Sequence, residues 1–305
     1  MIGCSSMPHP KGTPSLGAKT WHSYDAKEMP WRDNAVPSGK KLRAVVITVH
    51  GLSGAASDFW PLGEAWPPQG IAVCGLELRG QGNDPELQAR GDIPSARVWQ
   101  RDLHTFHRLI RARHPGVPVF WYAESLGTLI ALHALPSLPE HERPTAIVLS
   151  SPAAGLRLHM SALKNALVKT AVLVMPWKKV NLEKLAGVRD KDIHVTANTT
   201  HEGQMAKTPH YVPEFTLRLL GQINTMIQTL PKVAPQARQP LLVLASPNDV
   251  IASPEQIMTL YGELGSQDKT ILWYEKSYHL LLHDVQRKDV LDDATHWVKT
   301  QLHNR

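Results

Sequence analysis

The segment VFWYAESLGTLIALHAL, residues 119–135, begins as a dense apolar run typical of a strand and continues as a small-residue stretch typical of a helix. Ser125 lies at the junction, within Ala123-Glu124-Ser125-Leu126-Gly127. A serine in a tight strand-to-helix turn exposes its hydroxyl, and the residues two before and two after it must be small. Gly127 is the smallest residue possible at the position two after Ser125, and Ala123, two before it, is larger than glycine by one methyl group. The segment predicts either a nucleophile turn or an ordinary helix with an N-cap serine.

On both sides of this segment, runs of Val, Ile and Leu alternate with helical segments. We expect strands at 43–49, 71–78, 117–122, 145–150, 241–245 and 270–275, and helices at 57–66, 95–113, after 125, 254–264 and 287–302. Residues 21–32 predict one or two further short strands. Nearly continuous apolar strands separated by helices indicate a mostly parallel α/β sheet with helices on both faces.

The alternation stops near Gly155 and resumes at Leu241, with helical stretches and no convincing strand between them. With 305 residues, of which 42% are hydrophobic, the chain can bury a full core. We expect a flexible tail at 1–20, an α/β core at 21–155 and 237–305, and a helical cap inserted at 156–236.

Functional groups of a parallel sheet collect at the carboxyl ends of its strands, so the loops there carry the candidate site. His50-Gly51-Leu52 follows the strand expected at 43–49, and the N–H groups of Leu52 and Leu126 are candidate oxyanion donors. The alternative for this first loop is a glycine turn that only connects strand to helix. Asp249 follows the strand expected at 241–245 and is either a catalytic acid or a turn-forming Asp. His279 follows the last strand and is a candidate general base.

The order of these residues favours a catalytic triad. Ser125, Asp249 and His279 occur as serine, acid, histidine, each just after an expected strand, and an His-Gly turn lies upstream. Asp284 and Glu275 are alternative acids, but neither follows the penultimate strand.

Five segments together resemble the α/β-hydrolase superfamily, and within it the monoacylglycerol lipase and lysophospholipase group. They are VVITVHGLSGAASDFW, LELRGQGND, WYAESLGT, LLVLASPNDVI and YHLLLHD, in this order along the chain. The resemblance implies Ser125 as nucleophile, Asp249 as acid, His279 as base, and Leu52 and Leu126 as oxyanion donors. Ala123 and Asn83 depart from the group's pattern, where glycine and serine are usual.

The expected activity is that of a serine carboxylester hydrolase that cleaves single-acyl-chain lipids, a monoacylglycerol or a lysophospholipid, through an acyl-enzyme. The same triad could serve a serine aminopeptidase, a thioesterase or an acyltransferase, and the fold could also belong to a ligand-binding protein without catalysis. No cofactor is expected. Pairs such as His104 and His107, or His279 and His283, lack the carboxylates or thiols of a metal site.

The chain's formal net charge of +6 lies entirely between Leu156 and Pro235, where eleven basic and five acidic residues occur. This favours an anionic substrate or peripheral contact of the cap with an anionic membrane, and no nucleic-acid motif accompanies it. Ala166 to Trp177 is nearly all apolar and is either a lid that contacts acyl chains and lipid or a cap helix packed on the core. The oligomeric state is left open.

The two cysteines are poorly placed to form a disulfide. Cys74 is expected to be a buried thiol. Met1-Ile2-Gly3-Cys4-Ser5-Ser6 resembles the end of a bacterial lipoprotein signal, although the upstream basic and apolar regions are missing. The chain as given is expected in the cytoplasm, or at a membrane through a lipidated Cys4 if the true start lies upstream of Met1.

Overall fold

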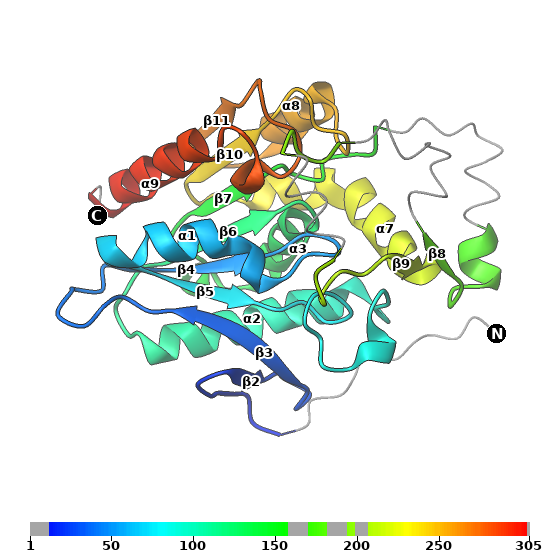
Figure 1. The fold of residues 1–305 in the computed structure, drawn as a ribbon, viewed down its shortest axis with the longest axis horizontal. Coiled ribbons are helices and arrows are strands. Elements are labelled where there is room, and N and C mark those ends of the chain that lie inside the picture. The colour runs from blue at the N-terminus through cyan, green and yellow to red at the C-terminus, as the bar shows by residue number, and fades with distance from the viewer. Residues whose placement is uncertain (1–11, 158–169, 182–193, 199–206, 304–305) are drawn as a thin grey trace.

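A computed structural model describes residues 12–157, 170–181, 194–198 and 207–303 of the chain. The strands of the main sheet are β1 (Ser15–Leu16), β2 (Thr20–His22), β3 (Glu28–Asn34), β4 (Ala44–Val49), β5 (Ile71–Leu76), β6 (Val119–Glu124), β7 (Ile147–Ser150), β10 (Leu241–Ala245) and β11 (Lys269–Trp273). They lie in the order β1-β2-β3-β5-β4-β6-β7-β10-β11 (Figure 1). Neighbours from β5 to β11 are parallel, and β1, β2 and β3 join the β5 edge in antiparallel pairs. The predicted mostly parallel sheet is confirmed.

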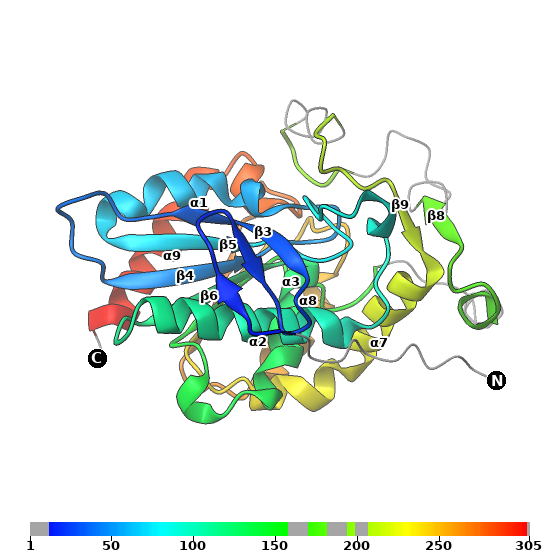
Figure 2. The ribbon, with the colours of Figure 1, turned by 90° about the horizontal axis from the view of Figure 1, so that it is seen from below.

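Helices cover both faces of this sheet. The described helices are α1 (Trp60–Ala65), α2 (Ala96–Arg113), α3 (Leu126–Ala134), α7 (Leu217–Val233), α8 (Pro254–Glu263) and α9 (Arg287–His303), of which α7 packs against α2 and α3. The two buried clusters place α1 and α9 on one face of the sheet and α2 and α3 on the other, and Figure 2 shows α1 and α2 on opposite sides of the strands. Successive side chains of a strand point to opposite faces, so Trp121 and Tyr122 enter two separate buried clusters. Burial on both faces explains why the strands read as continuous apolar runs.

The region predicted as a helical cap contains two short strands. β8 (Lys179–Asn181) and β9 (Glu214–Thr216) pair antiparallel, so the expectation of no strand between 156 and 236 was wrong. Each strand has three residues, too few to show a periodicity, and its partner is distant in sequence. In α7, Leu219, Met226 and Leu230 join the same buried cluster as α3. The cap boundaries at 156–236 stay a prediction.

The start of the described chain is tied to the sheet. Ser15, Leu16 and Thr20, within the expected flexible tail, lie in β1 and β2. Trp21 is fully buried, and Trp31 Nε1 donates to the Gly17 carbonyl at 3.1 Å. Burial of these indoles orders the chain from about residue 15, and Cys4 lies outside the described residues.

Cys74 is a free thiol buried in β5, as expected, and burial raises the pKa of this thiol well above its usual range. Among the described helices, none combines the length and the apolar character needed to cross a membrane.

Candidate active site

Ser125 occupies the turn between β6 and α3 with a backbone φ of +52° and ψ of −118°. A positive φ is strained for a residue other than glycine and persists only where the surroundings enforce it. Here Ser125 N–H donates to the Ser150 carbonyl at 3.0 Å, and the Thr128 hydroxyl donates to the Ser125 carbonyl at 2.6 Å. Ser125 holds the N-cap position of α3 but its hydroxyl caps no backbone N–H. The N-cap alternative therefore does not account for this side chain.

The hydroxyl of Ser125 points instead to His279. Ser125 Oγ lies 2.8 Å from His279 Nε2, and His279 Nδ1 lies 2.8 Å from Asp249 Oδ2. His279 and Asp249 are buried, at 5% and 0% exposure. With a proton on Nδ1, the imidazole donates to the carboxylate and accepts from the serine, which is the arrangement a general base requires. The structure thus brings together three residues from loops that are distant in sequence.

Asp249 also forms the turn that was its alternative interpretation. Its Oδ1 accepts hydrogen bonds from the backbone N–H groups of Ile251 at 2.7 Å and Ala252 at 3.3 Å. Its Oδ2 is left for His279. The two carboxylate oxygens therefore serve two purposes, because the turn fixes the orientation in which the acid meets the imidazole.

The two buried groups stabilise each other's charged forms. Burial by itself raises the pKa of Asp249, but the imidazole of His279 and the two backbone N–H groups outweigh it and lower this pKa below its usual value. Burial by itself lowers the pKa of His279, but the Asp249 carboxylate, with a contribution from Glu124, raises it above its usual value. A raised pKa favours the imidazolium that forms when His279 takes a proton.

The backbone N–H groups of Leu52 and Leu126 are both available beside Ser125. Neither donates a hydrogen bond to another residue that the structure describes. The Gly51 carbonyl accepts from Gly54 N–H at 3.2 Å and faces His50 Nδ1 at 2.9 Å. His50 Nε2 accepts from Leu78 N–H at 3.1 Å, which leaves the ring proton on Nδ1. Because the C=O and N–H of a trans peptide point in opposite directions, these bonds also fix the direction of the Leu52 N–H.

Close backbone packing explains the small residues around Ser125. A Cβ at Gly127 would lie 2.1 Å from the Val49 carbonyl oxygen, and one at Gly51 would lie 3.0 Å from the Ser125 Cβ. Ala123, by contrast, lies in β6 opposite Val49, and its methyl group is buried in the core. The position two before Ser125 therefore accepts alanine, whereas the position two after it requires glycine.

A family model described as serine aminopeptidase, S33, matches residues 40–286, which is most of the chain. The chain belongs to this family. It is a hydrolase with the α/β-hydrolase fold. Among curated proteins, it is 25% identical to the phospholipase YtpA of Bacillus subtilis, over 82% of this chain and 93% of that protein. It is 24% identical to a monoacylglycerol lipase of Mycolicibacterium smegmatis, over 85% of this chain and 89% of that protein.

Solved structures of this hydrolase fold superpose on the chain over most of its length. A Paleococcus ferrophilus monoacylglycerol lipase gives a TM-score of 0.75 at 21% identity, over 89% of this chain and 98% of its own. A soluble variant of a Saccharomyces cerevisiae monoglyceride lipase, in complex with a substrate analog, gives a TM-score of 0.80 at 17% identity, over 97% of this chain and 99% of its own. At such identities the likeness establishes the fold.

Two residues of this hydrolase's site were not identified from the sequence. Ser151, with a φ of +45°, donates from its hydroxyl to the His279 carbonyl at 2.5 Å and so anchors the histidine loop. Glu124 precedes Ser125 and is buried, at 6% exposure. Burial raises the pKa of Glu124 to about 7, although the nearby imidazoles of His279 and His50 act in the opposite direction. No local pattern marks either residue, because each acts on a loop that is remote in sequence.

Replacing Glu124 by glutamine is expected to change the pH dependence of hydrolysis. The charged carboxylate raises the pKa of His279, and the base must be neutral to act. Glu124→Gln removes this charge, so the pKa of His279 falls and the acid limb of kcat/KM against pH moves to lower pH. We expect kcat at the optimum to stay within about threefold of wild type.

The measurement is kcat/KM for a soluble ester between acidic and alkaline pH. Glu140→Gln, an exposed carboxylate in the turn before β7, is the control and should leave the profile in place. Superimposable profiles of wild type and Glu124→Gln would show that Glu124 has no influence on the base.

Proposed function

We propose that the protein is a serine carboxylester hydrolase that works through an acyl-enzyme. The observation that carries the proposal is the hydrogen-bonded series Ser125–His279–Asp249 at the carboxyl ends of the sheet strands, beside two N–H groups without partners in the described chain. His279 Nε2 takes the proton of Ser125 as its Oγ attacks the ester carbonyl. The oxygen of that carbonyl becomes the oxyanion, which the N–H groups of Leu52 and Leu126 stabilise.

Departure of the alcohol completes the first half of the reaction: the imidazolium of His279, stabilised by Asp249, returns its proton to the leaving alcohol, and the acyl group stays on Ser125. The second half repeats these steps with water in place of serine. Water then attacks the acyl-enzyme with His279 again as base, and the fatty acid leaves. Every step uses side chains and backbone groups of this chain.

We further propose single-acyl-chain lipids, a monoacylglycerol or a lysophospholipid, as the substrates. The proteins it resembles carry the names monoacylglycerol lipase and phospholipase, and the segment 156–235 carries the basic excess. A panel of monoacylglycerols, lysophospholipids, p-nitrophenyl esters and aminoacyl amides tests this. We expect kcat/KM for the lipid esters to exceed that for the amides by at least about tenfold. A preference for the amides would indicate an aminopeptidase.

An exposed apolar surface lies next to β8, at the end of the molecule far from α9 (Figure 1). Leu173, Val174, Met175 and Trp177 are 72%, 62%, 45% and 69% exposed. Exposed Lys178 and Lys179 follow them. Val172 faces the other way and contacts α7 at Gly221. We propose that this surface, residues 173–179, contacts an anionic lipid interface; residues 166–169 of the predicted apolar lid lie outside the described chain.

The double variant Leu173→Ser/Trp177→Ser is expected to bind anionic phospholipid vesicles about tenfold more weakly, since partial burial of two such side chains is worth roughly 1.4 kcal/mol. Hydrolysis of a soluble ester should be unchanged. Flotation with vesicles measures the binding. Leu87→Ser is the matched control, because it removes an apolar side chain that is 66% exposed but lies outside residues 173–179. Equal flotation of all three proteins would exclude this surface as the lipid contact.

A further inference from the structure

The turn that carries the Leu52 N–H contains an unusual residue. Gly54 N–H donates to the Gly51 carbonyl at 3.2 Å and closes a four-residue turn with Leu52 and Ser53 at its centre. Ser53 has a φ of +59°. A positive φ at the third position of such a turn normally requires glycine or asparagine. A serine in this conformation persists only if contacts outside the turn hold it there.

Those contacts come from two directions. Ser53 N–H donates to the buried Gln81 Oε1 at 2.9 Å, which fixes the peptide between Leu52 and Ser53. The Ser53 hydroxyl donates to the Val212 carbonyl at 3.0 Å and accepts from Val212 N–H at 2.8 Å. Val212 is 4% exposed and lies in the predicted cap region, distant in sequence from the turn. One serine side chain therefore pairs with both backbone groups of a cap residue.

A second contact joins the same two segments. His210 Nε2 lies 3.4 Å from Asp58 Oδ1, and Asp58 Oδ2 accepts from Ala55 N–H at 2.8 Å. Residues 210–212 thus meet the Leu52 turn at Ser53 and the helical turn that follows it at Asp58. The hydrogen bonds of the Ser53 hydroxyl to the Val212 backbone and the His210–Asp58 contact together define the position of one segment on the other.

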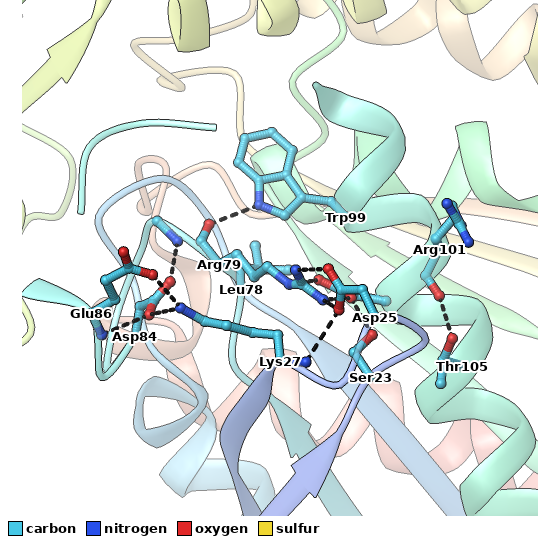
Figure 3. Close-up of polar contacts among 12 residues, drawn as sticks. Ser23, Asp25, Lys27, Leu78, Arg79, Asp84, Glu86, Trp99, Arg101 and Thr105 are labelled. Atoms are coloured by element: carbon cyan, nitrogen blue, oxygen red, sulfur yellow. Dashed lines mark hydrogen bonds and ion pairs between the residues drawn. The ribbon is translucent and has the colours of Figure 1, made fainter. Parts of the chain in front are cut away.

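The core side of the turn is anchored independently of the cap. The guanidinium of Arg79, two residues before Gln81, donates to Asp25 with two bonds of 2.6 Å (Figure 3). It also donates to Asp102 at 2.8 Å. Trp99 Nε1 donates to the Arg79 carbonyl at 2.9 Å (Figure 3). The loop that supplies Gln81 is therefore tied to β2–β3 and to α2, and the cap contact is the separate support of the turn.

We propose that Ser53 is a positioning residue through which cap residues 210–212 hold the Leu52 N–H in the direction that stabilises the oxyanion. The inference rests on the proposed function, because it takes Leu52 as an oxyanion donor. Without the Ser53 hydroxyl, the Gln81 bond is the remaining described contact of Ser53 outside the turn that opposes relaxation of its positive φ, and such relaxation would also shift the neighbouring peptide that carries the Leu52 N–H. Acyl transfer by Ser125 then depends on this part of the cap being in contact with the core.

Ser53→Ala tests the proposal with a soluble ester and with a trifluoromethyl ketone, which adds to Ser125 and forms a stable oxyanion. We expect kcat to fall roughly tenfold to thirtyfold, less than the ~10²–10³ that loss of a whole donor costs. KM should stay within about twofold, as for an interaction made only in the transition state. The Ki of the ketone should rise in proportion to the loss in kcat/KM, which a merely structural defect would not produce.

Ser57→Ala is the matched control, since the Ser57 hydroxyl makes no hydrogen bond to another described residue and Ser57 lies in the short helical turn, Ala56–Phe59, that follows the Leu52 turn. Ser53→Gly is a second variant, because glycine adopts a φ of +59° without strain while also lacking the hydroxyl. If Ser53→Ala does not fold, the kcat and the ketone Ki of the folded Ser53→Gly variant test the proposal in its place. A variant with wild-type kcat and wild-type Ki would overturn the proposal.

His210→Ala tests the cap side. A smaller fall in kcat with a proportionally smaller rise in ketone Ki is expected, and wild-type values would show that the turn does not depend on the cap. Failure of the proposed function is distinguished by the wild-type protein itself. If wild type does not react with a fluorophosphonate, Ser125 is not a nucleophile and the inference falls with it; if it reacts while Ser53→Ala keeps full activity, only the inference is wrong.

Discussion

The Ser125→Ala variant is expected to lose hydrolysis of every ester in the panel and to give no labelling by a fluorophosphonate. Without the nucleophilic oxygen no acyl-enzyme forms, and the remaining groups can only assist direct attack by water. Removal of the serine of a triad typically costs about 10⁴ to 10⁶ in kcat. The free energy of unfolding should change little. Alanine keeps the Cβ of the serine, and the lost hydroxyl makes a hydrogen bond only to His279 within the described chain. Thermal melting checks the fold alongside the assay.

Ser137→Ala provides the control for this experiment. Ser137 is an exposed serine in the turn that follows α3, so the variant should be labelled and should hydrolyse esters as wild type does. Labelling of a folded Ser125→Ala protein would place the nucleophile elsewhere and would contradict the assignment.

Asp249→Asn is expected to lower kcat by about 10⁴ while the protein stays folded. The N–H groups of Ile251 and Ala252 already donate to Oδ1, so the amide oxygen of asparagine will occupy that place. Its NH2 group then faces His279 Nδ1 and forces that nitrogen to accept. The ring proton moves to Nε2, which can no longer take the proton of Ser125. Steady-state kinetics of a soluble ester measures the loss.

The two alternative acids are tested beside it. Glu275 is exposed, and Glu275→Gln should retain wild-type kcat. Asp284 accepts from the backbone N–H groups of Ala197 and Tyr278 and so supports the histidine loop rather than the ring. If Asp284→Asn were to lose more activity than Asp249→Asn, the acid would be Asp284, and the geometry at His279 would have been misinterpreted.

Strand and helix positions could be predicted from local pattern because the sheet is buried on both faces. The segment 241–245 was predicted and observed with the same bounds, and the helix from Pro254 was predicted from Ser253 and its proline. The β8–β9 pair escaped prediction, because its short strands are defined by each other and not by their own sequence. The site followed a similar division. Residue type and order indicated Ser125, Asp249 and His279, whereas Glu124, Ser151 and Ser53 carry no distinguishing local signal.

The sequence by itself determined which residue types stand after which strands, and with them the fold class and a candidate nucleophile, acid and base. Only the tertiary structure decided between the alternatives at each position. It directs the Ser125 hydroxyl to His279 and not to a helix N-terminus, and it gives Asp249 one oxygen for a turn and the other for the imidazole. It also joins Ser53 to Val212. The reason is physical: periodicity and turn preference act over a few residues, whereas hydrogen-bond direction depends on groups that only the folded chain brings within 3 Å.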